Sequence, residues 1–500
     1  MQVRSLFLRV LALTFLIKLG LAAVLPLSGD EAYFIVWARH LDFGYYDHPP
    51  MVAWILAPLL PLVHAAWWVR LPALLFSSAV GVLVYRLLRP WGVERAAWTA
   101  TLFLLWPFDW MNVLITTDTP LILFVFLSGW SMVHAVRSDS RRAYALAGFW
   151  LGCAFLSKYF AVVYGLGLFG WFVFTADGRR RWRGALWLAL CALPEVVVNV
   201  YWNMTHCWDN ILFNLYNRNA GSTFSLHNTG LYLVTVLYLA TPPVLWAWWR
   251  DRRDVVPGAV TENRLYAFLF WVPTAFFLLL SLGKTIGLHW VLAFYPFLFL
   301  MIGLRTSGPR LRGLVRFMLG LAVVHALVLS VIVTAPAAWW QSTRFYSGYV
   351  LLVHPQSVLA AVRPFADGFR LATNDYSTSA LMSWHAGQEY FVFGPGSKHA
   401  RQDDMTTDFR ALAGRNILVF DKSPTPLTQY APYFRHVEQR RIIVDGAVFY
   451  LARGYGFDYP AYRQGVLARV RAQYYRVPDW LPMLRCGFCE RYFAAPVCAR

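Results

Sequence analysis

The stretch LFLRVLALTFLIKLGLAAVL, residues 6–25, is apolar except for Arg9, Thr14 and Lys18 and is long enough to cross a bilayer as a helix. Further apolar runs of roughly 15 to 20 residues occupy residues 71–85, 121–136, 231–249, 268–282 and 317–335. Of the 500 residues, 58% are hydrophobic and only 14% are charged, against about 25% charged in soluble domains. The sequence therefore predicts an α-helical polytopic membrane protein.

The chain is basic, with 45 Lys and Arg against 26 Asp and Glu and a formal net charge of +19. In a soluble protein this balance would indicate nucleic-acid binding. Here the basic residues form clusters between apolar runs: Arg86, Arg89 and Arg95; Arg137, Arg141 and Arg142; Arg179, Arg180, Arg181 and Arg183; Arg250, Arg252, Arg253 and Arg264; Arg305, Arg310, Arg312 and Arg316. The positive-inside rule explains them as cytoplasmic loops, so we expect no nucleic-acid partner.

This charge pattern predicts about eleven spans with the N-terminus in the cytoplasm and the segment after Ala335 outside. Residues 143–174 are expected to form two short helices that turn at Ser157 and Lys158. Residues 51–62 are too short to span and suit an interfacial helix. A cleaved signal peptide is the alternative interpretation of the first apolar segment; its length favours a membrane anchor.

After Ala335 the long apolar runs stop and polar residues increase. Strand-like segments are expected at residues 369–372, 390–393, 417–420 and 441–451, with a helix at 377–385. The sequence thus predicts a transmembrane domain over residues 1–340 and a C-terminal extracytoplasmic α/β domain over residues 341–500. For a bacterial inner membrane, this domain would lie on the periplasmic side.

The six cysteines fall into two groups along the chain. Cys153, Cys191 and Cys207 lie in or near spans and are interpreted as inert packing residues. Cys486, Cys489 and Cys498 lie near the C-terminus, where either a disulfide or a metal site is open. A lone CxxC with one further cysteine lacks a fourth ligand for a closed zinc site.

The first predicted outer loop, Ser28–Met51, carries the clearest candidates for chemistry. Asp30 and Glu31 directly follow the first span, where ionisable groups are candidate functional residues. Asp47 and His48 precede two prolines, which stiffen the chain and fix the direction of both side chains. Solvated loop acids and a simple turn are the alternative interpretations.

Four further residues fall on the same predicted side of the membrane. Asp118 stands at the start of a span with Pro120, where it could cap the helix. Lys158 is a lone base among apolar residues and could instead extend to the interface. Lys284 and His289 lie in a later outer loop beside Trp290. Acids, bases and histidines that converge beside lipid suit a lipid-phosphate substrate.

The motifs GDEAYFIVWARHLDFGYYDHPPMVAWI (residues 29–55), TTDTPL (116–121), AFLSKYF (154–160) and HW (289–290) resemble the bacterial GT-C membrane glycosyltransferases. The resemblance is to the branch related to protein O-mannosyltransferases and the lipid A aminoarabinose transferase, and it covers roughly residues 1–340. It implies sugar transfer from a polyprenyl-phosphate carrier to a lipid, glycan or protein acceptor of the cell envelope, outside the cytoplasmic membrane.

The resemblance also implies roles for individual residues. Asp30 matches the catalytic acid of the first outer loop, with Glu31 beside it. Asp47 and His48 match the second motif, although many members carry Lys at the position of His48. We expect Asp47, His48, Asp118, Lys158, Lys284 and His289 to bind substrate. No cofactor is required by the sequence, and a divalent metal is left open.

Two other functions compete with sugar transfer. A transporter or flippase of a lipid-linked sugar would use intramembrane Asp, Lys and His to line a pathway. Its substrate groups should lie near the midplane, whereas the candidate residues here cluster in outer loops. An inert scaffold or sensor would explain the outer domain and leave the first loop unexplained.

Overall fold

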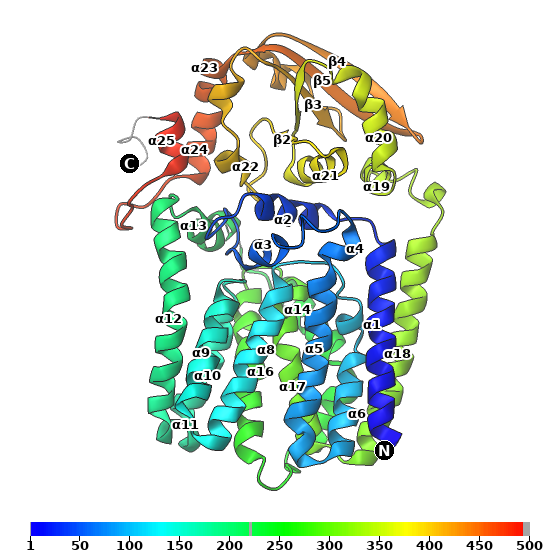
Figure 1. The fold of residues 1–500 in the computed structure, drawn as a ribbon, viewed down its shortest axis with the longest axis vertical. Helices are drawn as coiled ribbons and strands as arrows, with labels where there is room; N and C mark the ends of the chain where they lie inside the picture. Colours follow the sequence, from blue (N-terminus) through cyan, green and yellow to red (C-terminus); the bar gives the residue numbers. More distant parts are fainter. Residues whose placement is uncertain (1, 220–222, 494–500) are drawn as a thin grey trace.

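The chain, described by a computed structural model over residues 2–219 and 223–493, forms a helical bundle with a smaller α/β layer at one end (Figure 1). The bundle helices are α1 (Gln2–Val24), α5 (Leu71–Leu88), α6 (Val93–Leu104), α8 (Asp118–Ser138), α9 (Arg141–Phe155), α10 (Ala161–Phe174), α12 (Trp182–Thr205), α14 (Leu226–Ala240), α15 (Pro242–Arg250), α16 (Val260–Ser281), α17 (Tyr295–Arg305) and α18 (Gly308–Thr334).

Seven helices of the described chain are long and apolar enough to cross a membrane, or eight if the bent pair α14 and α15 counts as one span. Helices α9 and α10 have 15 and 14 residues, and at 1.5 Å per residue they are shorter than the hydrocarbon core. The expected number of about eleven includes such short helices and stays a prediction. The turn expected between residues 143 and 174 is confirmed, because α9 ends at Phe155 and α10 begins at Ala161.

The α/β layer contains one five-stranded sheet with the order β2-β1-β3-β5-β4. Its strands are β1 (Phe369–Thr373), β2 (Phe391–Val392), β3 (Asn416–Asp421), β4 (Phe434–Val444) and β5 (Ala447–Phe457). Strand β1 pairs in parallel with β2 and β3, whereas β5 is antiparallel to β3 and β4. The single strand expected over residues 441–451 was wrong. Asp445 and Gly446, both at positive φ, form a two-residue hairpin turn inside it.

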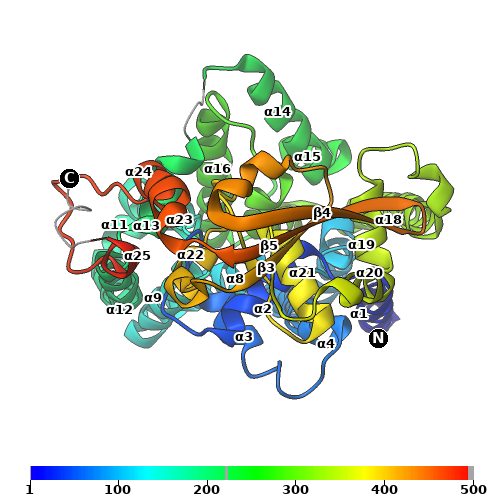
Figure 2. The same cartoon turned by 90° about the horizontal axis from the view of Figure 1, so that it is seen from above.

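Two short helices lie between the bundle and the sheet layer: α2 (Gly29–Arg39) and α3 (Met51–Leu56) (Figure 1). Helix α21 (Tyr376–Ala386) of the outer layer packs on α2, as the view from above also shows (Figure 2). A buried apolar cluster joins Trp37 of α2 to Leu381 and Trp384 of α21. The approach is close, because a Cβ at Gly29 would lie 1.7 Å from Ser377 Oγ.

A disulfide between Cys207 and Cys486 fastens the C-terminal segment to the bundle. Cys207 lies between α12 and the short helix α13 (Asp209–Leu215), so its interpretation as an inert packing residue was wrong. Its partner is 279 residues away in sequence, and only the folded chain brings the two thiols together. Cys489 is also disulfide-bonded, whereas Cys498 lies outside the described residues.

Candidate active site

Helix α2 places the first two acidic residues at the junction of bundle and outer layer. Ser28 caps the helix: its side chain accepts a hydrogen bond from the Glu31 amide, and the Glu31 carboxylate accepts one from the Ser28 amide. This reciprocal capping box fixes the first turn. Asp30 is exposed, and its Oδ1 accepts a hydrogen bond of 2.9 Å from the Tyr376 hydroxyl of α21. The outer layer therefore contacts the expected catalytic acid directly.

Glu31 turns away from Asp30 into the protein. Its two carboxylate oxygens accept hydrogen bonds of 2.7 Å from Nε and Nη2 of Arg70, and both side chains are fully buried. The Ile115 amide donates a further bond to Glu31 Oε1. Arg70 also donates to three carbonyl groups at the end of α1 and in the segment after it, those of Ala22, Leu25 and Pro26. These contacts favour a structural role for Glu31 over the expected catalytic one.

The segment after α2 carries Asp47 and His48. Asn214 of α13 donates its Nδ2 to the Asp47 carbonyl at 3.1 Å, and Asn210 Nδ2 bonds the Tyr45 carbonyl. The Asp47 side chain is buried, and in the described part of the chain its Oδ1 has no hydrogen-bond partner. Burial, with the charge of Asp30 adding, raises the pKa of Asp47 to about 7. Asp47 thus exchanges its proton near neutral pH.

His48 is half-buried beside the Trp37 ring. Burial lowers the pKa of His48 well below its usual range, and the charges of Lys158 and Arg218 add to this effect. The imidazole is therefore neutral at pH 7 and offers hydrogen bonds in place of positive charge. This position therefore carries no positive charge at neutral pH.

Asp47→Asn should stabilise the protein in alkaline solution. An acid whose pKa is raised on folding contributes stability below its unfolded pKa, about 3.9, and this contribution is lost as the pH rises through 7. We expect the melting temperature of the variant in detergent to exceed that of the native protein by about 2 °C or more at pH 8.5, and to match it near pH 4. Asp479→Asn, at an exposed turn, is the control. If the variant and the native protein differed in melting temperature by the same amount at both pH values, the titration of Asp47 would be contradicted.

Asp118, Lys158 and His289 form a second cluster. Asp118 is the first residue of α8, and its two oxygens lie 2.8 and 2.7 Å from Lys158 Nζ, in the turn between α9 and α10. Both side chains are buried, and His289 Nε2 lies 3.9 Å from Asp118 Oδ2. The anionic partner that Lys158 needs is thus supplied by the protein itself, which neutralises its charge.

An apolar groove runs along α10 and α16 and ends at two cations, Arg218 and Lys284. The groove has a volume of about 420 Å³ and is lined by Phe155, Phe160, Val163, Leu166, Phe276 and Leu280 among others. The Arg218 guanidinium lies 4.6 Å from the centre of the Trp290 ring, and Lys284 Nζ lies 5.4 Å from it. Burial, with the charge of Arg218 adding, lowers the pKa of Lys284 to about 8, so Lys284 remains largely protonated at neutral pH.

Most of the expected residues meet in one region. The charge of Asp30 affects the pKa of Asp47, and the charges of Lys158, Arg218 and His289 affect the pKa of His48. Lys284 lies at the edge, beside Arg218, and Glu31 faces away. The sequence interpretation did not assign roles to Arg218 or Tyr376. Arg218 is one of the few basic residues in the predicted outer loops, which is the only signal that could have found it, and Tyr376 belongs to no motif.

Within residues 2–219 and 223–493, no group of three or more His, Cys, Asp or Glu side chains is arranged to hold a metal ion. The divalent metal left open by the sequence stays untested.

The structure superposes with a TM-score of 0.65 on apo ArnT from Cupriavidus metallidurans, at 15% identity, covering 90% of this chain and 98% of that one. At this identity the likeness establishes the fold alone. The predicted resemblance to the GT-C branch of protein O-mannosyltransferases and the lipid A aminoarabinose transferase is confirmed by this fold together with two sequence matches.

Two sequence matches name particular relatives. Residues 47–202 match the family described as dolichyl-phosphate-mannose-protein mannosyltransferase. The chain is also 27% identical to the lipid A galacturonosyltransferase RgtD of Rhizobium johnstonii over 184 residues, and these residues make up 35% of this chain. The match spans 38% of the length of that relative.

Proposed function

We propose that this protein transfers a sugar from a polyprenyl-phosphate donor to an envelope acceptor on the outer face of the cytoplasmic membrane, with inversion at the anomeric carbon. The observation that carries the proposal is the apolar groove of α10 and α16, which ends at Arg218 and Lys284. Arg218 interacts electrostatically with Asp47 and Asp118. Its apolar walls suit an isoprenoid chain, and its cationic end suits the phosphate.

The proposed reaction is a single displacement at the anomeric carbon. Asp30 accepts the proton of the acceptor hydroxyl, whose oxygen attacks the anomeric carbon of the sugar. The bond from that carbon to the phosphate oxygen breaks, and its electron pair leaves with polyprenyl phosphate. The phosphate gains negative charge in the transition state, where nearby cations stabilise it more than in the ground state.

The phosphate contact is assigned to Arg218 and Lys284 rather than to Lys158. Lys158 is one of the substrate-binding residues expected from the sequence, but Asp118 neutralises its charge at a distance of 2.7 Å. Lys158→Met would also leave Asp118 buried without its partner. Breaking a buried ion pair in this way destabilises a protein by about 3–5 kcal/mol. Loss of activity in that variant would therefore not identify a phosphate contact.

Arg218→Met and Lys284→Met should each lower kcat/KM for the donor by about tenfold, since a hydrogen bond to a charged group contributes about 1.5–3 kcal/mol. The assay uses purified protein in detergent with radiolabelled polyprenyl-phosphate sugars and a crude envelope acceptor, and it measures free polyprenyl phosphate. Arg180→Met, an exposed arginine of α11 (Ala176–Arg180) at the opposite end of the bundle, is the matched control.

A flippase would behave differently in the same experiment. It would release no polyprenyl phosphate from any donor, and vesicles reconstituted with the protein would move intact donor across the bilayer. That pair of results would overturn the proposed transfer reaction.

A further inference from the structure

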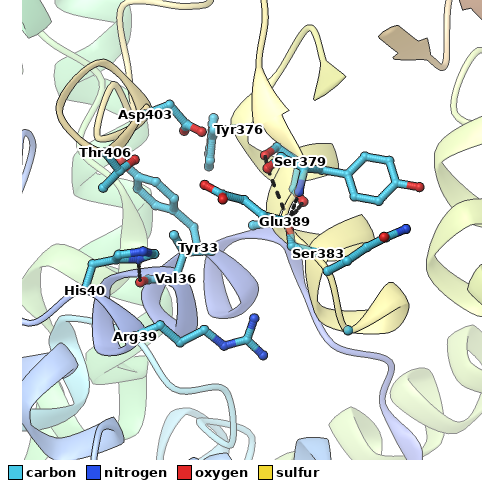
Figure 3. A pocket seen from close by; sticks show the side chains of 14 residues that line it. Tyr33, Val36, Arg39, His40, Tyr376, Ser379, Ser383, Glu389, Asp403 and Thr406 are labelled. Atoms are coloured by element: carbon cyan, nitrogen blue, oxygen red, sulfur yellow. Dashed lines mark hydrogen bonds between the residues drawn. The ribbon is translucent and has the colours of Figure 1, made fainter. Parts of the chain in front are cut away.

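A second hollow, the outer pocket, lies between α2 and α21 (Figure 3). It has a volume of about 250 Å³, and its lining includes Tyr33, Arg39, Tyr376, Ser383, Glu389 and Asp403. None of its lining residues borders the apolar groove of α10 and α16. The protein therefore has two separate pockets near Asp30 and Asp47.

Two tyrosines connect the outer pocket to the candidate active site. Tyr376 lines the pocket and donates its hydroxyl proton to Asp30 Oδ1 at 2.9 Å. Tyr33 also lines it, accepts a hydrogen bond of 3.1 Å from the Gln402 amide and lies near enough to Asp47 for the charge of that carboxylate to raise the pKa of Tyr33. A ligand in this pocket would thus lie one side chain away from both Asp30 and Asp47.

The lining indicates what the pocket binds. Glu389 and Asp403 disfavour an anion, and the many polar side chains disfavour an acyl chain. The hydroxyl groups of a ligand both donate and accept hydrogen bonds. They can therefore donate to the carboxylates of the lining, accept from Arg39 and bond the serines. The rings of Tyr33 and Tyr376 lie 5.0 Å apart and offer apolar surface with polar edges. These features together favour a sugar ring.

The pocket size agrees with this ligand. Sites for drug-sized ligands span about 300–1,000 Å³, so a volume of about 250 Å³ suits one ring better than a whole lipid. A neighbouring hollow of about 350 Å³ shares Gln388, Glu389 and Thr406 with the outer pocket. A chain of sugars could therefore continue past Glu389 along the surface of the outer layer.

We propose that the outer pocket binds one sugar of a glycan acceptor, so that the hydroxyl of the adjoining sugar reaches Asp30 past Tyr376, with Glu389 accepting hydrogen bonds from the hydroxyls of the bound ring. The inference rests on the proposed transfer reaction and specifies its acceptor as a saccharide. Burial also raises the pKa of Asp403 to about 7, so near neutral pH this side chain can either accept or donate a hydrogen bond to a hydroxyl.

The test measures acceptor kinetics in Glu389→Ala, an exposed position whose truncation leaves the core intact. Full-length protein in detergent receives polyprenyl-phosphate sugar and lipopolysaccharide with a truncated core as acceptor. We expect KM for lipopolysaccharide to rise at least about tenfold, with KM for the donor and kcat unchanged. Asp367→Asn, an exposed carboxylate of the outer layer that borders neither hollow, should behave as the native protein does.

A competition arm distinguishes the class of acceptor. The water-soluble, deacylated glycan of the same lipopolysaccharide should inhibit competitively against the acceptor, and Glu389→Ala should weaken this inhibition about tenfold or more. Inhibition by an unglycosylated peptide or by phospholipid alone, with none by the glycan, would overturn the saccharide assignment. An unchanged acceptor KM in Glu389→Ala would overturn the pocket assignment. Absence of donor cleavage in the native protein would instead overturn the proposed transfer reaction.

Discussion

Asp30→Asn is expected to lower the turnover of sugar transfer at least about a hundredfold, the usual contribution of a general base. The amide keeps the size of the carboxyl group but cannot accept the proton of the acceptor hydroxyl. Because Asp30 is exposed and bonds only the Tyr376 hydroxyl among the described residues, the change should leave folding intact. The amide oxygen of Asn can still accept that hydrogen bond.

The measurement is single-turnover transfer by purified protein, together with its melting temperature in detergent. Asp139→Asn, at the turn after α8 at the other end of the bundle, is the matched control. The residue has φ +47°, a conformation that Asn also tolerates. Near-native turnover by Asp30→Asn would remove Asp30 from the reaction.

Glu31→Gln is expected to destabilise the protein strongly, by about 3–5 kcal/mol, because it leaves the buried charge of Arg70 without its partner. Both side chains have no exposed surface, so solvent cannot compensate. Arg70 also holds the carbonyl groups of Leu25 and Pro26 at the end of α1. Loss of the pair should therefore loosen the entry into α2 and lower activity indirectly.

A double-mutant cycle with Arg70→Met tests this interpretation. The two single variants should lower the melting temperature, and the double variant should lower it by less than the sum of the two. Glu94→Gln, an exposed glutamate of α6, is the control for loss of one carboxylate. A folded Glu31→Gln protein with native stability and no transfer would instead support the catalytic role first expected for Glu31.

The membrane class and most of the helical bundle could be predicted from the sequence because both depend on short-range patterns. Apolar runs of spanning length and clusters of arginines are visible one segment at a time. The turn at Ser157 and Lys158 was predicted in the same way. The hairpin at Asp445 and Gly446 also has a local signal, the Asp-Gly pair between strand-like residues, which was overlooked within a longer apparent strand.

The capping role of Glu31 had a local signal as well. Ser28 followed by Glu31 has the spacing of a capping box before an apolar run. The partner that decides the role of Glu31 has no such signal, since Arg70 lies 39 residues further along the chain. Both residues appear in the sequence as outer polar groups, and their complete burial appears only once α1, α2 and α5 pack together.

By itself, the sequence determined the membrane class, the resemblance and the set of acids, bases and histidines, because each depends on residue type and local spacing. The tertiary structure decided which of these side chains neutralise one another: Asp118 pairs with Lys158, and Glu31 pairs with Arg70. It also brought Tyr376 from the outer layer to Asp30 and placed Arg218 and Lys284 at the end of one groove. The physical reason is that two buried charges attract each other most strongly when they lie a few ångströms apart in a low-dielectric interior, and residues far apart in sequence come that close only through folding.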